Sequence, residues 1–255
     1  MMNNTLEGKV AIVIGASKGI GKGIAEAISE LHPKGLVLAS RTQQDLDQVV
    51  SYIKKKYHTE ALAIATDVTV PSQIDNLFAQ TEKAYGKIDI VIHSGGLIQK
   101  DNEPLDTITD ERILAINLTN LVSVEYVGKR ALQRFRRQNS GIYLVISSEA
   151  GQKVYDNYEV YLGTKAGDNH VIRGLNETFK KDEISAYAFA VGPGLVDTPG
   201  AREAFPTVPE STWKKSQPID MAREHIIPAL TNPEEYKESF SSVNIVKTVN
   251  VEDTE

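Results

Sequence analysis

The sequence predicts an α/β fold, in which helices cover both faces of a single doubly wound parallel sheet of about six to seven strands. Two observations indicate this fold. Short apolar runs suited to buried strands alternate with longer segments of helical periodicity from one end of the chain to the other. A glycine-rich turn, GASKGIG at 15–21, joins the first apolar run to the first helical segment. The 255 residues suit one large domain with a sizeable core.

Each strand is predicted from an apolar run rich in β-branched or small residues. The run at 10–14 (VAIVI) contains no polar residue, which is typical of a parallel strand that is buried on both faces. The predicted strands cover residues 9–14, 35–40, 61–66, 88–93, 141–147 and 184–191, with a last strand around 243–249.

The segments between these strands carry apolar residues at a spacing of three and four. In the first, Ile20, Ile24 and Ile28 fall on one helix face, and Pro71 is well placed to begin the third helix. The predicted helices run from the glycine turn to about residue 30, over 42–57 and 71–85, and over about 106–137, 157–180 and 220–230.

The pattern changes from Gly192 onward. Three prolines, at positions 199, 206 and 209, predict about twenty residues without regular structure. Because loops of this length in compact domains are usually functional, we expect residues 194–217 to form a substrate loop or lid. We expect residues 232–255 to form an atypical C-terminal tail.

Composition excludes several classes of function. The net charge of −6 gives no basic surface for nucleic acid, and the chain has no cysteine for disulfides, thiolate metal sites or a cysteine nucleophile. The five histidines lack metal-ligand spacing, so no metal is expected. No apolar run approaches the roughly 20 residues of a membrane helix, and no signal pattern precedes the first strand. We therefore expect a cytoplasmic protein with no nucleic-acid or membrane partner.

The turn at 15–21 predicts an anion site. Glycines there permit positive φ and close approach of a ligand, while the amides and dipole at the helix start favour an anion such as the pyrophosphate of a dinucleotide. The spacing is Gly-x-x-x-Gly-x-Gly and does not match the general Gly-x-Gly-x-x-Gly fingerprint. A P-loop matches less well, because Lys22 is followed by Gly23 and not by Ser or Thr. We expect residues 1–255 to form a single dinucleotide-binding and catalytic domain with a Rossmann fold.

The residues after the second strand favour NADP(H) over NAD(H). Arg41 stands where NAD-binding proteins place a carboxylate for the adenosine ribose, and Lys18 adds a second cation. Asp45 and Asp47 fall a turn into the next helix. Two cations without a competing carboxylate suit the 2′-phosphate of NADP, because phosphate pairs strongly with guanidinium and ammonium groups.

A tyrosine and a lysine supply the candidate chemistry. Tyr161 and Lys165, at i and i+4, share one helix face, so the ammonium can stabilise the phenolate and make the phenol a useful proton donor or acceptor. Ser147 and Ser148 end the fifth strand at its carboxyl edge, where ligands bind in such sheets. Asn117 lies within an apolar run, where a buried amide must find partners.

Together these motifs resemble the short-chain dehydrogenase/reductase family over about residues 8–200, and the NADP(H)-preferring carbonyl reductases within it. The spacing from Ser148 to Tyr161 favours Ser148 over Ser147 as the catalytic serine. The landmarks occur in family order and are Gly15, Gly19 and Gly21, then Asp67 and Val68, Gly95 and Gly96, Asn117, Ser148 with Tyr161 and Lys165, and Pro193 and Gly194 followed by Thr198.

The chain departs from the family at four places. Ile14 replaces a Thr or Ser, residues 93–96 (HSGG) replace Asn-Asn-Ala-Gly, and Gly192 replaces a frequent Asn. The usual Gly-Gly-containing last strand is absent. We expect the first two departures to change stability or cofactor affinity before chemistry.

The resemblance implies a role for each matched residue. Tyr161 would be the general acid in reduction and the general base in oxidation, Lys165 would assist it and hold the nicotinamide ribose, and Ser148 would polarise the substrate carbonyl. Asn117 would anchor a water that links Lys165 to solvent. The implied cofactor-binding residues are Gly15, Ser17, Lys18, Gly19, Ile20, Gly21, Arg41, Asp67, Val68, Ser94, Gly95, Gly96, Tyr161, Lys165, Pro193, Gly194, Val196 and Thr198.

The leading hypothesis is an NADPH-dependent oxidoreductase that reduces a small ketone, diketone or aldehyde, with Tyr161 as general acid. Aromatic residues at 155, 158, 205 and 213 favour an apolar substrate or serve only in packing. One alternative is an NADP-dependent dehydrogenase of a sugar or secondary alcohol. Another is a catalytically silent NADP(H)-binding regulatory protein. Family members commonly form homodimers or homotetramers through the helices at 106–137 and 157–180, so we expect one of these assemblies.

Overall fold

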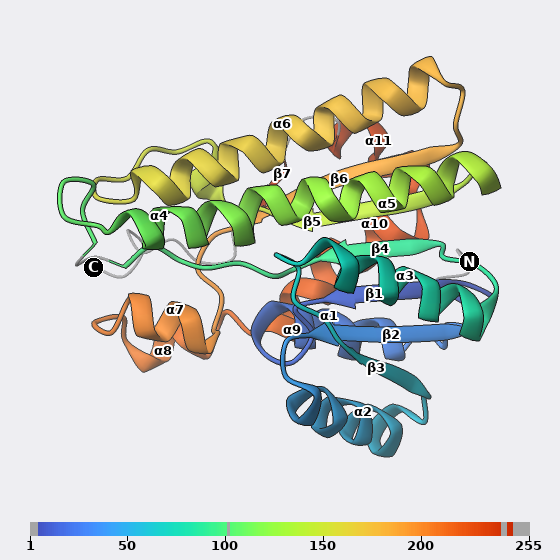
Figure 1. Cartoon of the computed structure of the whole chain (residues 1–255). Coiled ribbons are helices and arrows are strands. Elements are labelled where there is room, and N and C mark those ends of the chain that lie inside the picture. The colour runs from blue at the N-terminus through green and yellow to red at the C-terminus, as the bar shows by residue number, and fades with distance from the viewer. Residues whose placement is uncertain (1–4, 101–102, 241–243, 247–255) are drawn as a thin grey trace.

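The computed structural model describes residues 5–100, 103–240 and 244–246, and its centre is one parallel sheet (Figure 1). Seven strands lie in the order β3-β2-β1-β4-β5-β6-β7, and every neighbouring pair is parallel. Their bounds are β1 Val10–Ile14, β2 Gly35–Ser40, β3 Ala61–Ala65, β4 Ile90–His93, β5 Gly141–Ile146, β6 Ala186–Pro193 and β7 Asn244–Val246. The doubly wound α/β prediction is confirmed. The strand order reverses between β1 and β4, which is where such sheets bind ligands.

Helices cover both faces of the sheet because successive strand residues point to opposite sides. Ala11 and Val13 of β1 belong to a core shared with α1 (Gly19–Ser29) and α2 (Gln43–Tyr57). Ile12 and Ile14 belong to the opposite core, which is built with α3, α5 and α6. These three helices span Pro71–Tyr85, Ser123–Gln138 and Glu159–Lys181.

The helix predicted over 106–137 is interrupted by a π-helical turn. It begins as α4 (Asp110–Asn117), where the Thr109 hydroxyl accepts a hydrogen bond from the amide of Arg112. The π turn Leu118–Val122 then leads into α5. Such turns insert an extra residue into a helix and frequently occur at functional sites. Here the turn directly follows Asn117.

The prediction that residues 194–217 lack regular structure is wrong. This segment contains α7 (Pro199–Ala204) and α8 (Glu210–Trp213), which lie apart from the sheet in Figure 1. Pro199 occupies the first turn of α7, and the Thr198 hydroxyl accepts a hydrogen bond from the amide of Ala201. Pro199 and Pro209 therefore stand at helix starts, where a missing N–H has no cost, whereas Pro206 lies in the turn between the two helices.

The C-terminal part continues with short helices and one edge strand. The helix predicted over 220–230 is split into α9 (Pro218–Met221), a π turn (Ala222–Ile226) and α10 (Ile227–Thr231). Two elements fall in the tail predicted at 232–255, α11 (Pro233–Phe240) and β7, and β7 pairs with the end of β6. Residues 243 and 247–249 of the predicted last strand lie outside the described residues. No helix of the described chain is both long and apolar enough to cross a membrane.

Candidate functional site

The glycine turn after β1 lies directly against the loop that follows β4. Gly15 has a φ of +81°, and a Cβ atom on it would sit 2.8 Å from the amide nitrogen of Gly95. Gly19 has a φ of +56°, and a Cβ atom there would meet the Thr198 side chain at 3.1 Å. Three segments that are distant in sequence therefore meet at the carboxyl edge of the sheet, as the switch-point prediction requires.

Two buried hydroxyls at this edge lack partners. The Oγ atoms of Ser40, at the end of β2, and Ser94, after β4, are buried and make no hydrogen bond with the described residues. Buried polar groups are nearly always paired, so such orphans indicate an absent partner. Lys18, the N-cap residue of α1, makes no side-chain capping hydrogen bond, and the first turn of the helix contains no acidic residue. These features fit a bound dinucleotide rich in phosphate and hydroxyl groups.

The segments implied to hold the adenosine end differ in their contacts. Arg41 is exposed at the end of β2, and its guanidinium makes no hydrogen bond or ion pair with a described residue. Asp67 is already engaged, because its Oδ1 accepts hydrogen bonds from the amide and hydroxyl of Thr69 at 2.9 and 2.7 Å. Val68 is largely buried beside it.

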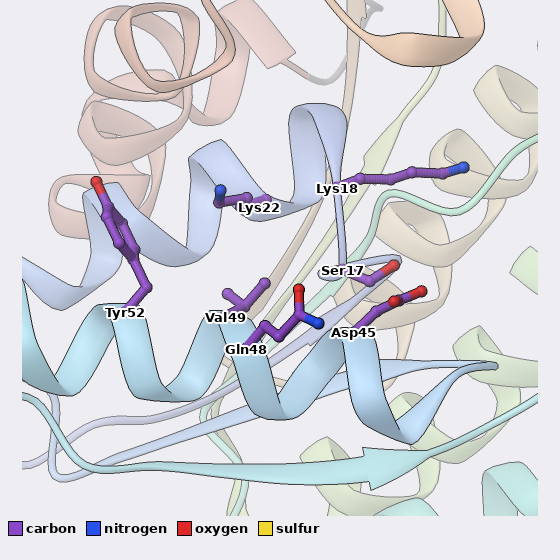
Figure 2. A pocket seen from close by; sticks show the side chains of 7 residues that line it. All are labelled: Ser17, Lys18, Lys22, Asp45, Gln48, Val49 and Tyr52. Atoms are coloured by element: carbon purple, nitrogen blue, oxygen red, sulfur yellow. The ribbon is translucent and has the colours of Figure 1, made fainter.

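A cavity of about 320 Å³ opens beside the glycine turn, between α1 and α2 (Figure 2). It contains two residues predicted to bind the cofactor, Ser17 and Lys18, and several that were not predicted. Figure 2 shows Ser17 close to Asp45 of α2, while Lys18 extends away from Lys22. The full lining is Ser17, Lys18, Lys22, Asp45, Gln48, Val49 and Tyr52.

The structure distinguishes the two serines at the end of β5. Ser147 is buried, and its hydroxyl donates to Oδ1 of Asn169 on α6 at 2.8 Å. Ser148 is half-buried and accepts a hydrogen bond from the amide of Ala150, at the start of the 3₁₀ turn Glu149–Gly151. Ser147 therefore serves to pack α6 on β5, which leaves Ser148 as the candidate.

Tyr161 and Lys165 lie one turn apart on α6, and the Lys165 Nζ is 5.8 Å from the centre of the Tyr161 ring. Lys165 is 4% exposed, and its ammonium has two hydrogen-bond partners. It donates to the carbonyl oxygen of Ile146 at 3.1 Å and to Oδ2 of Asp168 at 3.0 Å. The sequence interpretation missed Asp168, although its spacing of three from Lys165 places both on one helix face.

Asp168 keeps the lysine charged. Burial alone would lower the pKa of Lys165, but the Asp168 carboxylate and the neighbouring Tyr161 together outweigh it, and the pKa is raised. Burial raises the pKa of Asp168 itself, against the opposing effect of Lys165. A buried charge without its partner is strongly unfavourable, so each member of this pair requires the other.

Asn117 does not have the buried position expected from its apolar surroundings. It is half-buried, and its Nδ2 donates to the carbonyl oxygen of Ile113 in its own helix at 2.9 Å. The fully buried amide is that of Asn120, whose Oδ1 accepts from the amide of Leu97 at 2.7 Å and whose Nδ2 donates to Oγ1 of Thr164 at 3.2 Å. No hydrogen bond between described residues joins Asn117 to Lys165.

His93, the departure at the end of β4, is a buried neutral residue. Its Nε2 lies 2.8 Å from the hydroxyl of Ser123, which donates to the carbonyl oxygen of Thr119 at 2.6 Å, so Nε2 acts as the donor. Burial and then the charge of Lys165 lower the pKa of His93 to about 3. Gly96, in the same segment 93–96, is exposed, and a Cβ atom on it would be 4.0 Å from the Lys165 Nζ.

The residues predicted after β6 lie where the chain leaves the sheet. Pro193 ends β6, Gly194 is half-buried, and Val196 is buried. Thr198 lies against Gly19. Ile20, the remaining residue of the glycine turn that is predicted to bind the cofactor, is half-buried. Thr198 thus lies beside the N-terminus of α1, and the binding of the cofactor by residues 193–198 stays a prediction.

Comparison with known families agrees with this geometry. The family model described as short chain dehydrogenase matches residues 9–209. The chain belongs to this family. Its members are oxidoreductases whose fold binds NAD or NADP. Among its relatives is an uncharacterized oxidoreductase of Staphylococcus aureus strain MRSA252, 32% identical over 228 residues, which cover 89% of this chain and 93% of that protein.

More distant relatives carry functional names. An NADP-dependent 3-hydroxy acid dehydrogenase of Schizosaccharomyces pombe is 28% identical over 237 residues, which cover 90% of this chain and 89% of that protein. The structure of an alcohol dehydrogenase from Thermococcus sibiricus, complexed with 5-hydroxy-NADP, matches with a TM-score of 0.80 at 24% identity over 95% of this chain and 97% of that one. A 7α-hydroxysteroid dehydrogenase matches with a TM-score of 0.85 at 22% identity over 99% and 98%. These structures show the shared fold.

The Lys165–Asp168 pair predicts a large loss of stability when one charge is removed. Asp168→Asn should lower the free energy of unfolding by about 3–5 kcal/mol, because it leaves the Lys165 ammonium buried and unpaired. Urea unfolding at neutral pH measures this. The matched control is Asp182→Asn just after α6, where the carboxylate pairs with Arg136 at the surface; this change should cost less than about 1 kcal/mol. Equal losses in the two variants would contradict the prediction.

His93 predicts a pH-dependent component of stability. Its pKa is about 3 in the folded chain against 6.5 ordinarily, so between these values the unfolded chain binds one more proton. Stability therefore falls as the pH drops below about 6.5, with a slope from this residue of up to about 1.4 kcal/mol per pH unit. His93→Asn should remove that component in urea unfolding between pH 5 and 7.5. His58→Asn, at an exposed histidine, should keep the wild-type slope, and an unchanged slope in His93→Asn would refute the assignment.

Proposed function

We propose that this protein is an NADPH-dependent reductase of small carbonyl compounds. The observation that carries the proposal is the phenol of Tyr161 above the buried, charged Lys165, on a helix that packs against the turn that follows Ser148. A phenol beside a fixed ammonium is suited to donate a proton, since the phenolate that remains is stabilised.

In the proposed reaction, NADPH supplies a hydride to the carbonyl carbon and the protein supplies the proton. Tyr161 donates its hydroxyl proton to the carbonyl oxygen, Ser148 donates a hydrogen bond to the same oxygen, and Lys165 stabilises the tyrosinate. Asn117 would anchor a water that returns a proton from solvent, and the π turn after it supports an irregular site there. Oxidation of an alcohol uses the same groups in reverse.

The cofactor would lie along the carboxyl edge of the sheet. Gly15, Gly19 and Gly21 would admit the pyrophosphate, and the loop at 94–96 would pass beside it. Asp67 and Val68 would border the adenine, and the residues at 193–198 would hold the carboxamide. The exposed Arg41 and Lys18 favour NADP(H), because both cations are available for the 2′-phosphate.

The segment 194–217 would cover the substrate. Phe205 after α7 stacks on Tyr158 at the start of α6, with ring centres 6.2 Å apart. Two aromatic rings bridging the segment and α6 favour an apolar substrate such as a ketone, diketone or aldehyde. The name of the S. pombe relative supports the alternative, an NADP-dependent dehydrogenase of a secondary alcohol. The proposal includes a homodimer or homotetramer formed through α4, α5 and α6, where Leu114 is 58% exposed.

Turnover of carbonyl compounds tests the function. The purified protein should oxidise NADPH in the presence of at least one class among aldehydes, aromatic ketones, diketones and keto-sugars, as measured by absorbance at the nicotinamide band. Tyr161→Phe should lower kcat by at least about 10²-fold, since it removes the general acid, while NADPH still binds. Tyr85→Phe, at the end of α3, is the matched control and should keep full activity. Tight NADPH binding without turnover in either direction would instead indicate a silent binding protein.

Arg41 tests the choice of cofactor. Arg41→Ala should weaken NADPH binding by about 10- to 100-fold, the equivalent of one charge-assisted contact, and should leave NADH binding unchanged. Fluorescence titration with both cofactors measures the two affinities. The matched control is Arg173→Ala, at an exposed arginine on α6, which should leave the affinities for both NADPH and NADH unchanged. Equal affinities of the wild type for NADPH and NADH, unaffected by Arg41→Ala, would contradict the assignment.

A further inference from the structure

A buried glutamine in the loop after β4 holds the first turn of the helix that carries Tyr161. Gln99 is fully buried, and its Oε1 accepts hydrogen bonds from the amides of Val160 and Tyr161, both at 3.1 Å. Its Nε2 donates to the carbonyl oxygen of Glu103 at 2.7 Å. The side-chain amide thus connects its own loop with α6, which lies 61 and 62 residues further along the chain.

These bonds replace a local helix cap. The first amides of a helix have no partner within it and need acceptors from elsewhere. The N-cap residue of α6, Tyr158, makes no side-chain capping hydrogen bond. Gln99 supplies the missing acceptor from a distance, and one of the two amides it binds belongs to Tyr161 itself.

The loop that carries Gln99 is fixed on both sides. Arg112 of α4 donates through Nε to Oε1 of Glu103 at 2.8 Å and through Nη2 to the carbonyl oxygen of Ile98 at 2.8 Å. Before Gln99, the amide and carbonyl groups of Leu97 bond to Asn120 at 2.7 and 2.9 Å. The residues around Gln99 are therefore held by hydrogen bonds to Arg112 and Asn120, so that Gln99 can hold the first turn of α6 in one position.

We propose that Gln99 is a positioning residue that sets the place of Tyr161 for proton transfer. This inference rests on the proposed reductase function. Gln99 would not touch substrate or cofactor and would act through the backbone of the first turn of α6. Without its acceptor, that turn can shift, and a displacement of about 1 Å at a catalytic group can lower the rate by about 10²-fold. Substrate and cofactor contacts elsewhere would remain, so kcat would change more than KM.

Two substitutions separate positioning from simple stabilisation. Gln99→Met has a similar length but no acceptor, so kcat should fall by about 10- to 100-fold, with KM and NADPH affinity within about threefold of the wild type. Gln99→Glu keeps an acceptor oxygen for both amides but loses the donor to the carbonyl oxygen of Glu103, so it should retain more of kcat than Gln99→Met does. The matched control is Gln138→Met. Gln138 likewise joins two backbone segments through its side-chain amide, but its Nε2 donates to the carbonyl oxygens of Ile88 and Ser140, at 2.7 and 2.8 Å, at the amino-terminal edge of the sheet. Gln138→Met should lower the free energy of unfolding and leave kcat unchanged.

Several outcomes would overturn the inference. Gln99→Met with wild-type kcat would show that the bonds serve folding alone. If Gln99→Met does not fold, Gln99→Asn, whose shorter amide cannot reach α6, should show the same loss of kcat.

Hydrogen exchange at the α6 N-terminus provides a readout that is independent of turnover. Mass spectrometry should show faster exchange at residues 159–162 in Gln99→Met than in the wild type and Gln99→Glu. A wild type that turns over nothing would overturn the proposed function, and the catalytic role of Gln99 with it. An active wild type with an unchanged Gln99→Met overturns only the role of Gln99.

Discussion

The candidate site depends on one charge held away from water, the ammonium of Lys165. Its burial is offset by the carboxylate of Asp168 and the carbonyl oxygen of Ile146. The same charge disfavours protonation of His93 on β4, which stays neutral and hydrogen-bonded to Ser123 of α5. Four elements, β4, β5, α5 and α6, thus share a buried polar layer behind the phenol of Tyr161. Because unpaired groups in such a layer are costly, its members are fixed together.

Close backbone approach is the second constraint. The glycine turn lies so near the loop after β4 that a side chain at Gly15 would overlap the backbone of Ser94 and Gly95. This contact brings the predicted pyrophosphate site and the predicted nicotinamide site onto one edge of the sheet. The departures from the family pattern at 93–96 leave this contact in place. His93 turns into the buried layer, where Ser123 satisfies it, and the backbone of the following residues keeps its approach to Gly15.

The sequence predicts the features that depend on local periodicity and spacing. Each strand, each helix and the glycine turn can be predicted from a short stretch of sequence, and the α/β fold follows from their order. The Tyr161–Lys165 pair can be predicted in the same way, because its two residues lie one helix turn apart. Asp168, Asn120 and Gln99 were missed, because a polar residue in sequence does not reveal which distant group it will meet. Asn117 was predicted to be buried and is half-buried, because the π turn that follows it changes which helix face enters the core. The prolines at 199 and 209 indicate either a break or a helix start, and tertiary packing decides between them.

The segment 97–100, together with Glu103, contacts three parts of the site with bonds of unequal strength. Its contacts with α4 and α6, through Arg112 and Gln99, are at least half-buried. Its contact with α7 is an ion pair between Lys100 and Glu203, whose side chains are 45% and 66% exposed. Exposed pairs contribute about 1 kcal/mol or less, whereas a buried amide that loses its acceptor costs about 1–3 kcal/mol. The ion pair with α7 is therefore a weaker attachment than the bonds to α4 and α6, and the segment 194–217 also meets α6 through the stacking of Phe205 on Tyr158. Under the proposed function, the cover over the substrate would be held less firmly to the segment 97–100 than the proton donor Tyr161 is.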